Sequence, residues 1–207
     1  MIIVSHRGYW KETAEQNQRT AFTRSFDLGF GTETDVRDCG GKVVIAHDMP
    51  QGGEMTLEEV LQIMDGRNLP LALNIKADGL AAAILELLEK YSHTNYFTFD
   101  MSIPDMVMQM KRGLRVFTGL SDIVPVPVML EQSAGVWLDC FHSDWYGTET
   151  IDDLIENGKF VCIVSSELHK RTTEKQWEII KHCKSVDSEY LLLCTDEPER
   201  AKEFFET

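Results

Sequence analysis

The sequence predicts an α/β protein, a small (β/α)8 barrel of the TIM-barrel type that forms one domain over residues 1–207. About eight short apolar segments with strand character alternate with segments of helical periodicity. Such alternation predicts a parallel sheet, and eight units predict a closed barrel. A doubly wound open sheet is the alternative, but the glycine-rich phosphate loop typical of that fold is missing. No repeat, low-complexity run or linker divides the chain.

The first part of the chain predicts strands that end in polar residues. Residues 2–4 are a short apolar strand, and residues 19–28 carry aromatic side chains at helical spacing up to a pair of glycines. Residues 31–37 are the second strand. After a glycine turn, residues 42–46 return as a further strand. This order predicts a helix between two strands, followed by a hairpin.

The rest of the chain continues the alternation. Thr56 and Glu59 have the spacing of a capping box at a helix start. The predicted helices cover residues 56–65, 79–91, 104–111, 149–156 and 173–183, and a last helix has Asp196 as N-cap and Pro198 in its first turn. The predicted strands cover residues 69–76, 96–99, 115–119, 135–139, 160–164 and 190–194. Residues 122–132 are rich in proline and valine and fit neither pattern.

Composition and charge exclude several function classes. A hydrophobic fraction of 43% is ordinary for a soluble domain with a buried core, and the net charge of −14 argues against nucleic acids and anionic membranes as partners. The five scattered cysteines without CxxC spacing indicate thiols in a reducing compartment rather than a zinc site. Neither a signal peptide nor an apolar run of ~20 residues is evident. We expect a cytoplasmic protein without stable membrane insertion, and the sequence does not indicate its oligomeric state.

Two carboxylates on one strand predict a metal site. Glu33 and Asp35 are two residues apart, so a strand places both on the same face. Such a pair suits a hard divalent cation, Mg²⁺ or Ca²⁺. His6 precedes the pair and His47 follows it, which supplies proton carriers, and Arg7 supplies a fixed positive charge. These residue types together predict a site that cleaves phosphodiesters.

The same residues resemble the glycerophosphodiester phosphodiesterase family, within the group of phospholipase-C-like phosphodiesterase barrels. The matching motifs are His6-Arg7-Gly8, Asn17 ahead of Ala21-Phe22, Gly31-x-Glu33-x-Asp35-Val36, Val44-Ile45-Ala46-His47-Asp48, a strand ending in Ile75-Lys76, and Thr195-Asp196-x-Pro198. The resemblance implies that His6 and His47 are the acid and base. It further implies that Arg7 and Lys76 bind the substrate phosphate and that Glu33 and Asp35 ligate the metal. Asp48 or Asn17 could orient the histidines.

Three features differ from the pattern of the family. Asn74 stands where the third metal ligand is a glutamate, Gln16 replaces a glutamate before Asn17, and residues 49–55 leave no room for the usual cap insertion. At an effective dielectric constant of 20, a carboxylate ~4 Å from a charge contributes on the order of 4 kcal/mol of gross attraction. The carbonyl oxygen of Asn74 can restore part of this as a ligand. We expect weaker metal binding and less repulsion of a phosphate.

Two loops further along the chain are candidates for the substrate pocket. Trp145 follows the predicted strand 135–139, and His169 follows the strand 160–164. In barrel enzymes the active site lies at the carboxyl ends of the strands. Both residues could therefore contact substrate, and the alternative is that they belong to polar surface loops.

The sequence thus predicts a metal-dependent phosphodiester hydrolase with histidine acid/base catalysis. The substrate is a small soluble diester, such as a glycerophosphodiester or a sugar-phosphate diester, and the resemblance implies a link to lipid metabolism. The reaction can proceed through a cyclic phosphate, or end there. The alternative is a catalytically impaired barrel that binds a phosphorylated metabolite or partner. Asn74 and Gln16 favour that alternative, whereas the retention of two histidines argues against it.

Overall fold

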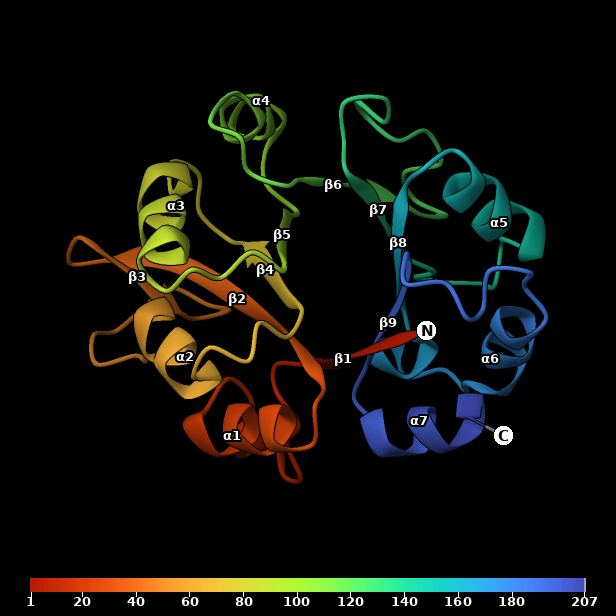
Figure 1. Ribbon diagram of the computed structural model, residues 1–207, viewed down its shortest axis with the longest axis horizontal. Helices are drawn as coiled ribbons and strands as arrows, with labels where there is room; N and C mark the ends of the chain where they lie inside the picture. The colour runs from red at the N-terminus through yellow and green to blue at the C-terminus, as the bar shows by residue number, and fades with distance from the viewer. Residues whose placement is uncertain (207) are drawn as a thin grey trace. The chain divides into compact units, whose positions relative to one another are not determined.

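The computed structural model describes residues 1–206, which form two compact units. The N-terminal unit is Ser5–Val116, and the C-terminal unit begins at Phe117 and includes Met1–Val4. Within residues 1–206 there are nine strands and seven α-helices, which alternate except that β3 follows β2 and β7 follows β6 without a helix between them (Figure 1). Eight strands are parallel members of the sheet, and the ninth, β3, pairs antiparallel with β2. The predicted fold class, a (β/α)8 barrel, is confirmed.

The N-terminal unit contains the strands that lead to the predicted site. Its elements are β1 (Ile2–His6, of which Ser5 and His6 belong to this unit), the 3-10 turn η1 (Thr13–Glu15), α1 (Arg19–Asp27), β2 (Gly31–Cys39), β3 (Lys42–Ile45), α2 (Leu57–Met64), β4 (Leu71–Ile75), α3 (Ala81–Lys90), β5 (Tyr96–Phe99) and α4 (Ile103–Lys111). The strand order is β5-β4-β2-β1. In the register of β2 and β4, Asp35 is the partner of Asn74.

Burial on both faces explains why β4 does not alternate between polar and apolar residues, whereas residues 32–35 of β2 are buried and all polar. Every residue of β4 is buried, as are residues 31–36 of β2. Helices α1 and α2 cover this part of the sheet with side chains such as Phe22, Leu57 and Leu61, which are fully or almost fully buried. Parallel strands that are buried on both faces usually consist of continuous apolar residues. The buried polar residues of these two strands therefore require hydrogen-bond or charge partners; they are Thr32, Glu33, Thr34, Asp35 and Asn74.

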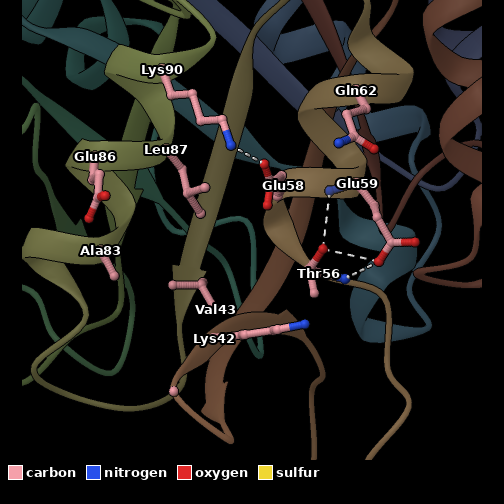
Figure 2. A pocket seen from close by; sticks show the side chains of 11 residues that line it. Lys42, Val43, Thr56, Glu58, Glu59, Gln62, Ala83, Glu86, Leu87 and Lys90 are labelled. Carbon is pink, nitrogen blue, oxygen red and sulfur yellow. Dashed lines mark hydrogen bonds and ion pairs between the residues drawn. The ribbon is translucent and has the colours of Figure 1, made fainter.

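A groove of about 470 Å³ lies on the outside of this unit, between β3, α2 and α3 (Figure 2). The predicted capping box is present at its edge: the Thr56 hydroxyl accepts the Glu59 amide at 3.2 Å, and the Glu59 carboxylate accepts the Thr56 amide at 2.9 Å. Lys90 of α3 pairs with Glu58 of α2 across the groove at 2.6 Å. None of the predicted site residues lines this groove, so it is separate from the predicted chemistry.

The C-terminal unit repeats the pattern of strand and helix. Its elements are β6 (Phe117–Leu120), β7 (Gly135–Leu138), α5 (Thr148–Glu156), β8 (Phe160–Val164), the 3-10 turn η2 (Ser166–His169), α6 (Glu174–Lys181), β9 (Leu191–Thr195) and α7 (Pro198–Glu206). The strand order is β1-β9-β8-β7-β6, and α5, α6 and α7 lie along one side of these strands (Figure 1). Val136, Ile163, Leu193 and Trp177 are central members of its buried core.

The connection between β6 and β7 contains turns instead of a helix, which resolves the ambiguous residues 122–132. Pro125 and Pro127 lack the amide hydrogens that a helix interior requires. The Ser121 hydroxyl accepts the amides of Ile123 at 3.2 Å and Val124 at 2.9 Å, which closes a tight turn instead. Because this turn displays its apolar residues outward, Ile123 and Val124 are among the exposed large hydrophobic residues.

Most element boundaries agree with the predictions within two residues. The strand predicted over 69–76 begins at Leu71, since Pro70 has no amide for the ladder and contributes only its carbonyl, which accepts the Thr32 amide at 2.9 Å. The last helix begins at Pro198, so Glu197 rather than Asp196 precedes it. No helix within residues 1–206 combines the length and apolarity needed to cross a lipid bilayer.

Gly135, the first residue of β7, lies where the packing leaves no room for a side chain. A Cβ atom there would lie 2.6 Å from the Phe160 carbonyl oxygen and 2.7 Å from the Phe117 ring. We predict that Gly135→Ala lowers the free energy of unfolding by about 1–3 kcal/mol through overpacking, measured by thermal or urea denaturation. Gly119→Ala in β6 is the matched control, because no atom lies within 4 Å of its added Cβ. Equal stability of the two variants would contradict the prediction.

Candidate active site

The site is built on β2, whose two acidic side chains are almost completely buried. Glu33 is 2% exposed and Asp35 is 1% exposed. The ladder to β4 and the hairpin to β3 satisfy the strand backbone, and the Asp35 carbonyl accepts the Ala46 amide at 3.0 Å. A buried carboxylate is costly unless cations or hydrogen-bond donors face it. The partners of these two side chains therefore define the site.

Two cations and one amide converge on Asp35. Arg7 Nε lies 3.0 Å from Asp35 Oδ2, and Lys76 Nζ lies 3.5 Å from Oδ1. Asn17 Nδ2 donates a hydrogen bond to Asp35 Oδ2 at 3.0 Å. The Arg7 contact is an ion pair without the alignment of a hydrogen bond, and Arg7 Nε has no acceptor within residues 1–206. Arg7 Nε is thus paired with Asp35 by charge, and its N–H is not aligned on an acceptor of the described residues.

The backbone around Arg7 is held in an unusual conformation. Arg7 and Asn17 have positive φ angles of 57° and 58°, and the Asn17 amide donates to the Arg7 carbonyl at 2.9 Å. Gly8 also has positive φ, and a Cβ there would lie 2.8 Å from the Ala21 Cβ, so the loop passes close to α1. Residues in sparsely populated conformations concentrate at functional sites. This bend places the Arg7 side chain over the carboxylates.

Asn17 has a different partner from the one that the sequence suggested. Its side chain donates to Asp35, and its Oδ1 accepts the Thr34 hydroxyl at 2.8 Å. It therefore contacts a carboxylate, whereas the sequence suggested a contact with a histidine. Asn is tolerated at positive φ, so the position of Asn17 in this loop is consistent with the role. The sequence alone does not identify the partner of its side chain.

Glu33 lies between His6 and Arg7. Its Oε2 is 3.9 Å from His6 Nε2 and accepts the Arg7 amide at 3.3 Å. Burial raises the pKa of Glu33 to about 7. The His6 charge opposes that rise in pKa, and the negative charge of Asp35 adds to it. Strongly shifted groups of this kind, buried beside specific charge partners, are typical of functional sites.

The oxygens of Asp35 and Asn74 fit a hard cation. Asp35 Oδ1 and Asn74 Oδ1 are buried, and neither has a hydrogen-bond partner within residues 1–206. The two residues are register partners on neighbouring parallel strands, so their side chains lie on the same face. Within the described chain, no group of three or more His, Cys, Asp or Glu residues is arranged to hold a metal. Glu33, Asp35 and Asn74 thus offer two carboxylates and one amide oxygen, ligand types that Mg²⁺ and Ca²⁺ accept.

His47 follows β3 and is half exposed. Its carbonyl accepts Arg37 Nε at 3.1 Å, and its Nδ1 lies 2.9 Å from Asp48 Oδ1. Asp48 thus contacts this histidine, as the sequence suggested that it could. The Ala46 amide donates a hydrogen bond to the Asp35 carbonyl, so the residue directly before His47 lies beside the strand that carries the two carboxylates. All seven residues predicted for acid/base, phosphate and metal roles lie in the N-terminal unit.

The two predicted pocket residues lie in the C-terminal unit, and both contact Asp139. Trp145 Nε1 donates to the Asp139 carbonyl at 2.8 Å, and His169 Nε2 lies 2.7 Å from Asp139 Oδ1. The Phe141 ring packs against His169, with centroids 4.8 Å apart. Sequence reasoning missed Asp139, although an acidic residue directly after an apolar strand was a usable signal. A substrate contact for Trp145 or His169 remains a prediction.

Comparisons with solved structures identify the same fold in known enzymes. An Oleispira antarctica phosphodiesterase, solved with its product sn-glycerol-3-phosphate, matches with a TM-score of 0.71 and 16% identity, over 100% of this chain and 97% of that one. A glycerophosphodiester phosphodiesterase from Agrobacterium tumefaciens matches with a TM-score of 0.71 and 15% identity, over 100% of both chains. The chain shares their fold. The sequence matches no protein-family model and no curated protein.

The fold alone does not determine the activity. N-(5'-phosphoribosyl)anthranilate isomerase from Pyrococcus furiosus also matches, with a TM-score of 0.51 and 13% identity, over 100% of this chain and 97% of that one. Barrels of this class support many reactions, so the function has to be inferred from the site.

Proposed function

We propose that the protein is a phosphodiester hydrolase that cleaves a small diester of the glycerophosphodiester or sugar-phosphate type. The observation that carries the proposal is the convergence of Arg7, Lys76 and Asn17 on the buried Asp35, beside Glu33 and His6. Cations, carboxylates and a proton carrier within one cluster are what phosphodiester cleavage requires. The fold shared with two phosphodiesterases supports the same reaction class.

Arg7 and Lys76 are the proposed phosphate ligands. Both are ion-paired to Asp35, and Arg7 keeps its buried Nε–H without an acceptor within residues 1–206. With Glu33 and Asp35 ionised, the two cations balance the two carboxylates, so the site does not repel a singly charged diester at short range. Fixed donors of this kind stabilise the negative charge that develops on the non-bridging oxygens in the transition state.

His6 and His47 are the proposed proton carriers. One removes the proton from the attacking hydroxyl, and the other protonates the leaving alkoxide, so that one P–O bond forms and one breaks. If a neighbouring hydroxyl of the substrate attacks, the first product is a cyclic phosphate, which water can then open to the monoester. Each proton transfer contributes ~10²–10⁴-fold to the rate.

Glu33, Asp35 and Asn74 are the proposed ligands for a divalent cation, Mg²⁺ or Ca²⁺. When bound, such a cation neutralises phosphate charge and polarises the P–O bonds. Asp35 Oδ1 and Asn74 Oδ1, which accept no hydrogen bond within residues 1–206, support this assignment, although Asp35 Oδ1 is also ion-paired with Lys76. Because only two of the three proposed ligands are anionic, moderate rather than tight binding is expected.

An assay on a generic aryl phosphodiester tests the proposed activity. The purified protein is compared with and without Mg²⁺, Ca²⁺ or Mn²⁺, and after chelation, together with a panel of glycerophosphodiesters. We expect metal-stimulated turnover. If no metal and no diester gives turnover, but a phosphomonoester binds to the protein, the alternative of a catalytically impaired binder is correct, for which the amide at position 74 is the supporting observation.

Asn74→Glu tests the metal assignment without relying on activity. A third carboxylate facing the cation should raise its affinity by about tenfold or more, given the size of one such charge interaction. Calorimetric titration with Mg²⁺ and Ca²⁺ measures this change, and Asn74→Gln controls for side-chain length. Unchanged affinity in the glutamate variant would place Asn74 outside the ligand set.

A further inference from the structure

Three consecutive backbone amides, those of residues 7–9, fix the bend after β1. The first and the third donate to backbone carbonyls, of Glu33 at 2.9 Å and of Ala21 at 3.0 Å. The second, the buried Gly8 amide, donates to a side chain, the Thr32 hydroxyl, at 2.9 Å. A buried amide without an acceptor is costly. Thr32 is therefore the side chain on which the closure of this bend depends.

The bend needs such support because two of its residues have a left-handed backbone. The φ angle is 57° at Arg7 and 79° at Gly8. A residue with a Cβ atom adopts this conformation only where the surrounding contacts enforce it. The direction of the Arg7 side chain, whose Nε lies 3.0 Å from Asp35 Oδ2, depends on this backbone. Loss of the Gly8 hydrogen bond should therefore release Arg7 from Asp35.

Thr32 belongs to a buried network of hydroxyl groups that fixes its orientation. It is fully buried, as are Ser5 and Ser25. The Thr32 hydroxyl has two carbonyl acceptors, of Ser5 at 3.1 Å and of Glu33 at 3.2 Å, and the Ser5 hydroxyl donates to it at 3.2 Å. Because side chains alternate along a strand, Thr32 lies on the face of β2 opposite Glu33. Its hydroxyl thus reaches the candidate site through backbone atoms alone.

We propose that Thr32 is a positioning residue of the candidate active site. By accepting the Gly8 amide, its hydroxyl holds Arg7 in the backbone conformation that directs the guanidinium to Asp35. The effect on turnover rests on the proposed function, in which Arg7 binds the substrate phosphate, whereas the orientation of Arg7 can be measured without substrate. Thr32 is buried behind the strand, so it acts through Arg7 and not on the substrate.

Thr32→Val tests the orientation of Arg7, because valine has nearly the shape of threonine but no hydroxyl. The readout is the Arg7 Nε–H signal in nitrogen-15 NMR of arginine-labelled protein, assigned by its absence in Arg7→Lys; this N–H is buried and should exchange slowly with water. We expect Thr32→Val to shift or broaden the signal, and Thr32→Ser, which keeps the acceptor, to leave it unchanged.

Ser25→Ala is the matched control for the loss of a buried hydroxyl. Ser25 belongs to the same network, where its hydroxyl contacts the Ser5 hydroxyl at 2.7 Å and donates to the Gly31 carbonyl at 3.1 Å. Neither contact involves the bend after β1. Ser25→Ala should therefore leave the Arg7 signal in its wild-type position, even if the variant unfolds at a lower temperature.

Kinetics on an aryl phosphodiester supply the second readout. A displaced Arg7 should lower kcat/KM by about 10- to 100-fold in Thr32→Val, mainly through a higher KM, whereas Ser25→Ala should keep wild-type kinetics. In an Arg7→Ala background, Thr32→Val should have no further effect, because its action passes through Arg7. Effects that simply add in the double variant would overturn the proposal.

The NMR outcomes are independent of turnover. The proposal fails if Thr32→Val leaves the Arg7 signal in place, or if Ser25→Ala shifts it equally. If the wild type cleaves no diester, the phosphodiesterase proposal fails, and the Arg7 signal still decides the role of Thr32. If Thr32→Val does not fold, hydrogen exchange of the wild type decides: the Gly8 amide should exchange slowly, and exchange at the rate of a free amide would overturn the proposal.

Discussion

Asp35→Ala is expected to lower kcat/KM for a phosphodiester by about 10³-fold or more, which corresponds to several kcal/mol of lost transition-state stabilisation. Asp35 contacts Arg7, Lys76 and Asn17 together. Its removal leaves both cations that we propose as phosphate ligands without their ion-pair partner, and takes one charged ligand from the proposed metal. Binding of Mg²⁺ or Ca²⁺, measured by calorimetry, should be lost in the same variant.

Two further variants separate this effect from a loss of folding. Asp35→Asn keeps the side-chain volume and should be as impaired as the alanine variant, with an unchanged far-UV spectrum. Asp38→Ala removes an exposed carboxylate from the same strand and should retain wild-type kinetics. A catalytic defect in Asp38→Ala of the same size as in Asp35→Ala would mean that strand charge in general, not the Asp35 cluster, controls activity.

His6→Ala is expected to reduce kcat by ~10²–10⁴-fold, the usual contribution of one acid or base. His47→Ala should show a loss in the same range. The exposed His182, at the end of α6, provides the control, since His182→Ala removes an imidazole that lies outside the proposed machinery.

The leaving group determines which histidine is the acid. An aryl oxide leaves without protonation, whereas an alkoxide requires a proton. Removal of the general acid should therefore slow an alkyl diester much more than an aryl diester, and removal of the base should slow both equally. Equal losses for both substrates in both variants would contradict a division of roles between His6 and His47.

The fold was predictable from the sequence because its signals are local. The capping box at Thr56 and Glu59 set the start of α2 within one residue, and the apolar strands 96–99 and 160–164 have the predicted bounds. The loop between β6 and β7 was not predictable, since its course depends on the contacts of Ser121 and Asp122 with neighbouring amides. Valine-rich segments with prolines fit edge strands and turns equally well.

The candidate site was predictable in its residue types but not in its pairings. Strand periodicity placed Glu33 and Asp35 on one face, and their shared neighbour Arg7 agrees with this, since Glu33 accepts its amide and Asp35 pairs with its side chain. The bond from Asn17 to Asp35 depends on a loop in which Arg7 and Asn17 both adopt positive φ. Neither this bend nor the pairing of Asp139 with His169 has a sequence pattern, because both arise from contacts between distant segments.

Phosphorus NMR of a glycerophosphodiester incubated with the protein and Mg²⁺ or Ca²⁺ is the most direct test of the phosphodiesterase proposal. The diester signal should disappear with the wild type, giving a monoester signal or a cyclic phosphate, and should persist with Asp35→Ala. A persistent diester signal with the wild type under every metal condition would contradict the proposal. Equal conversion by the Asp35→Ala protein would also contradict it.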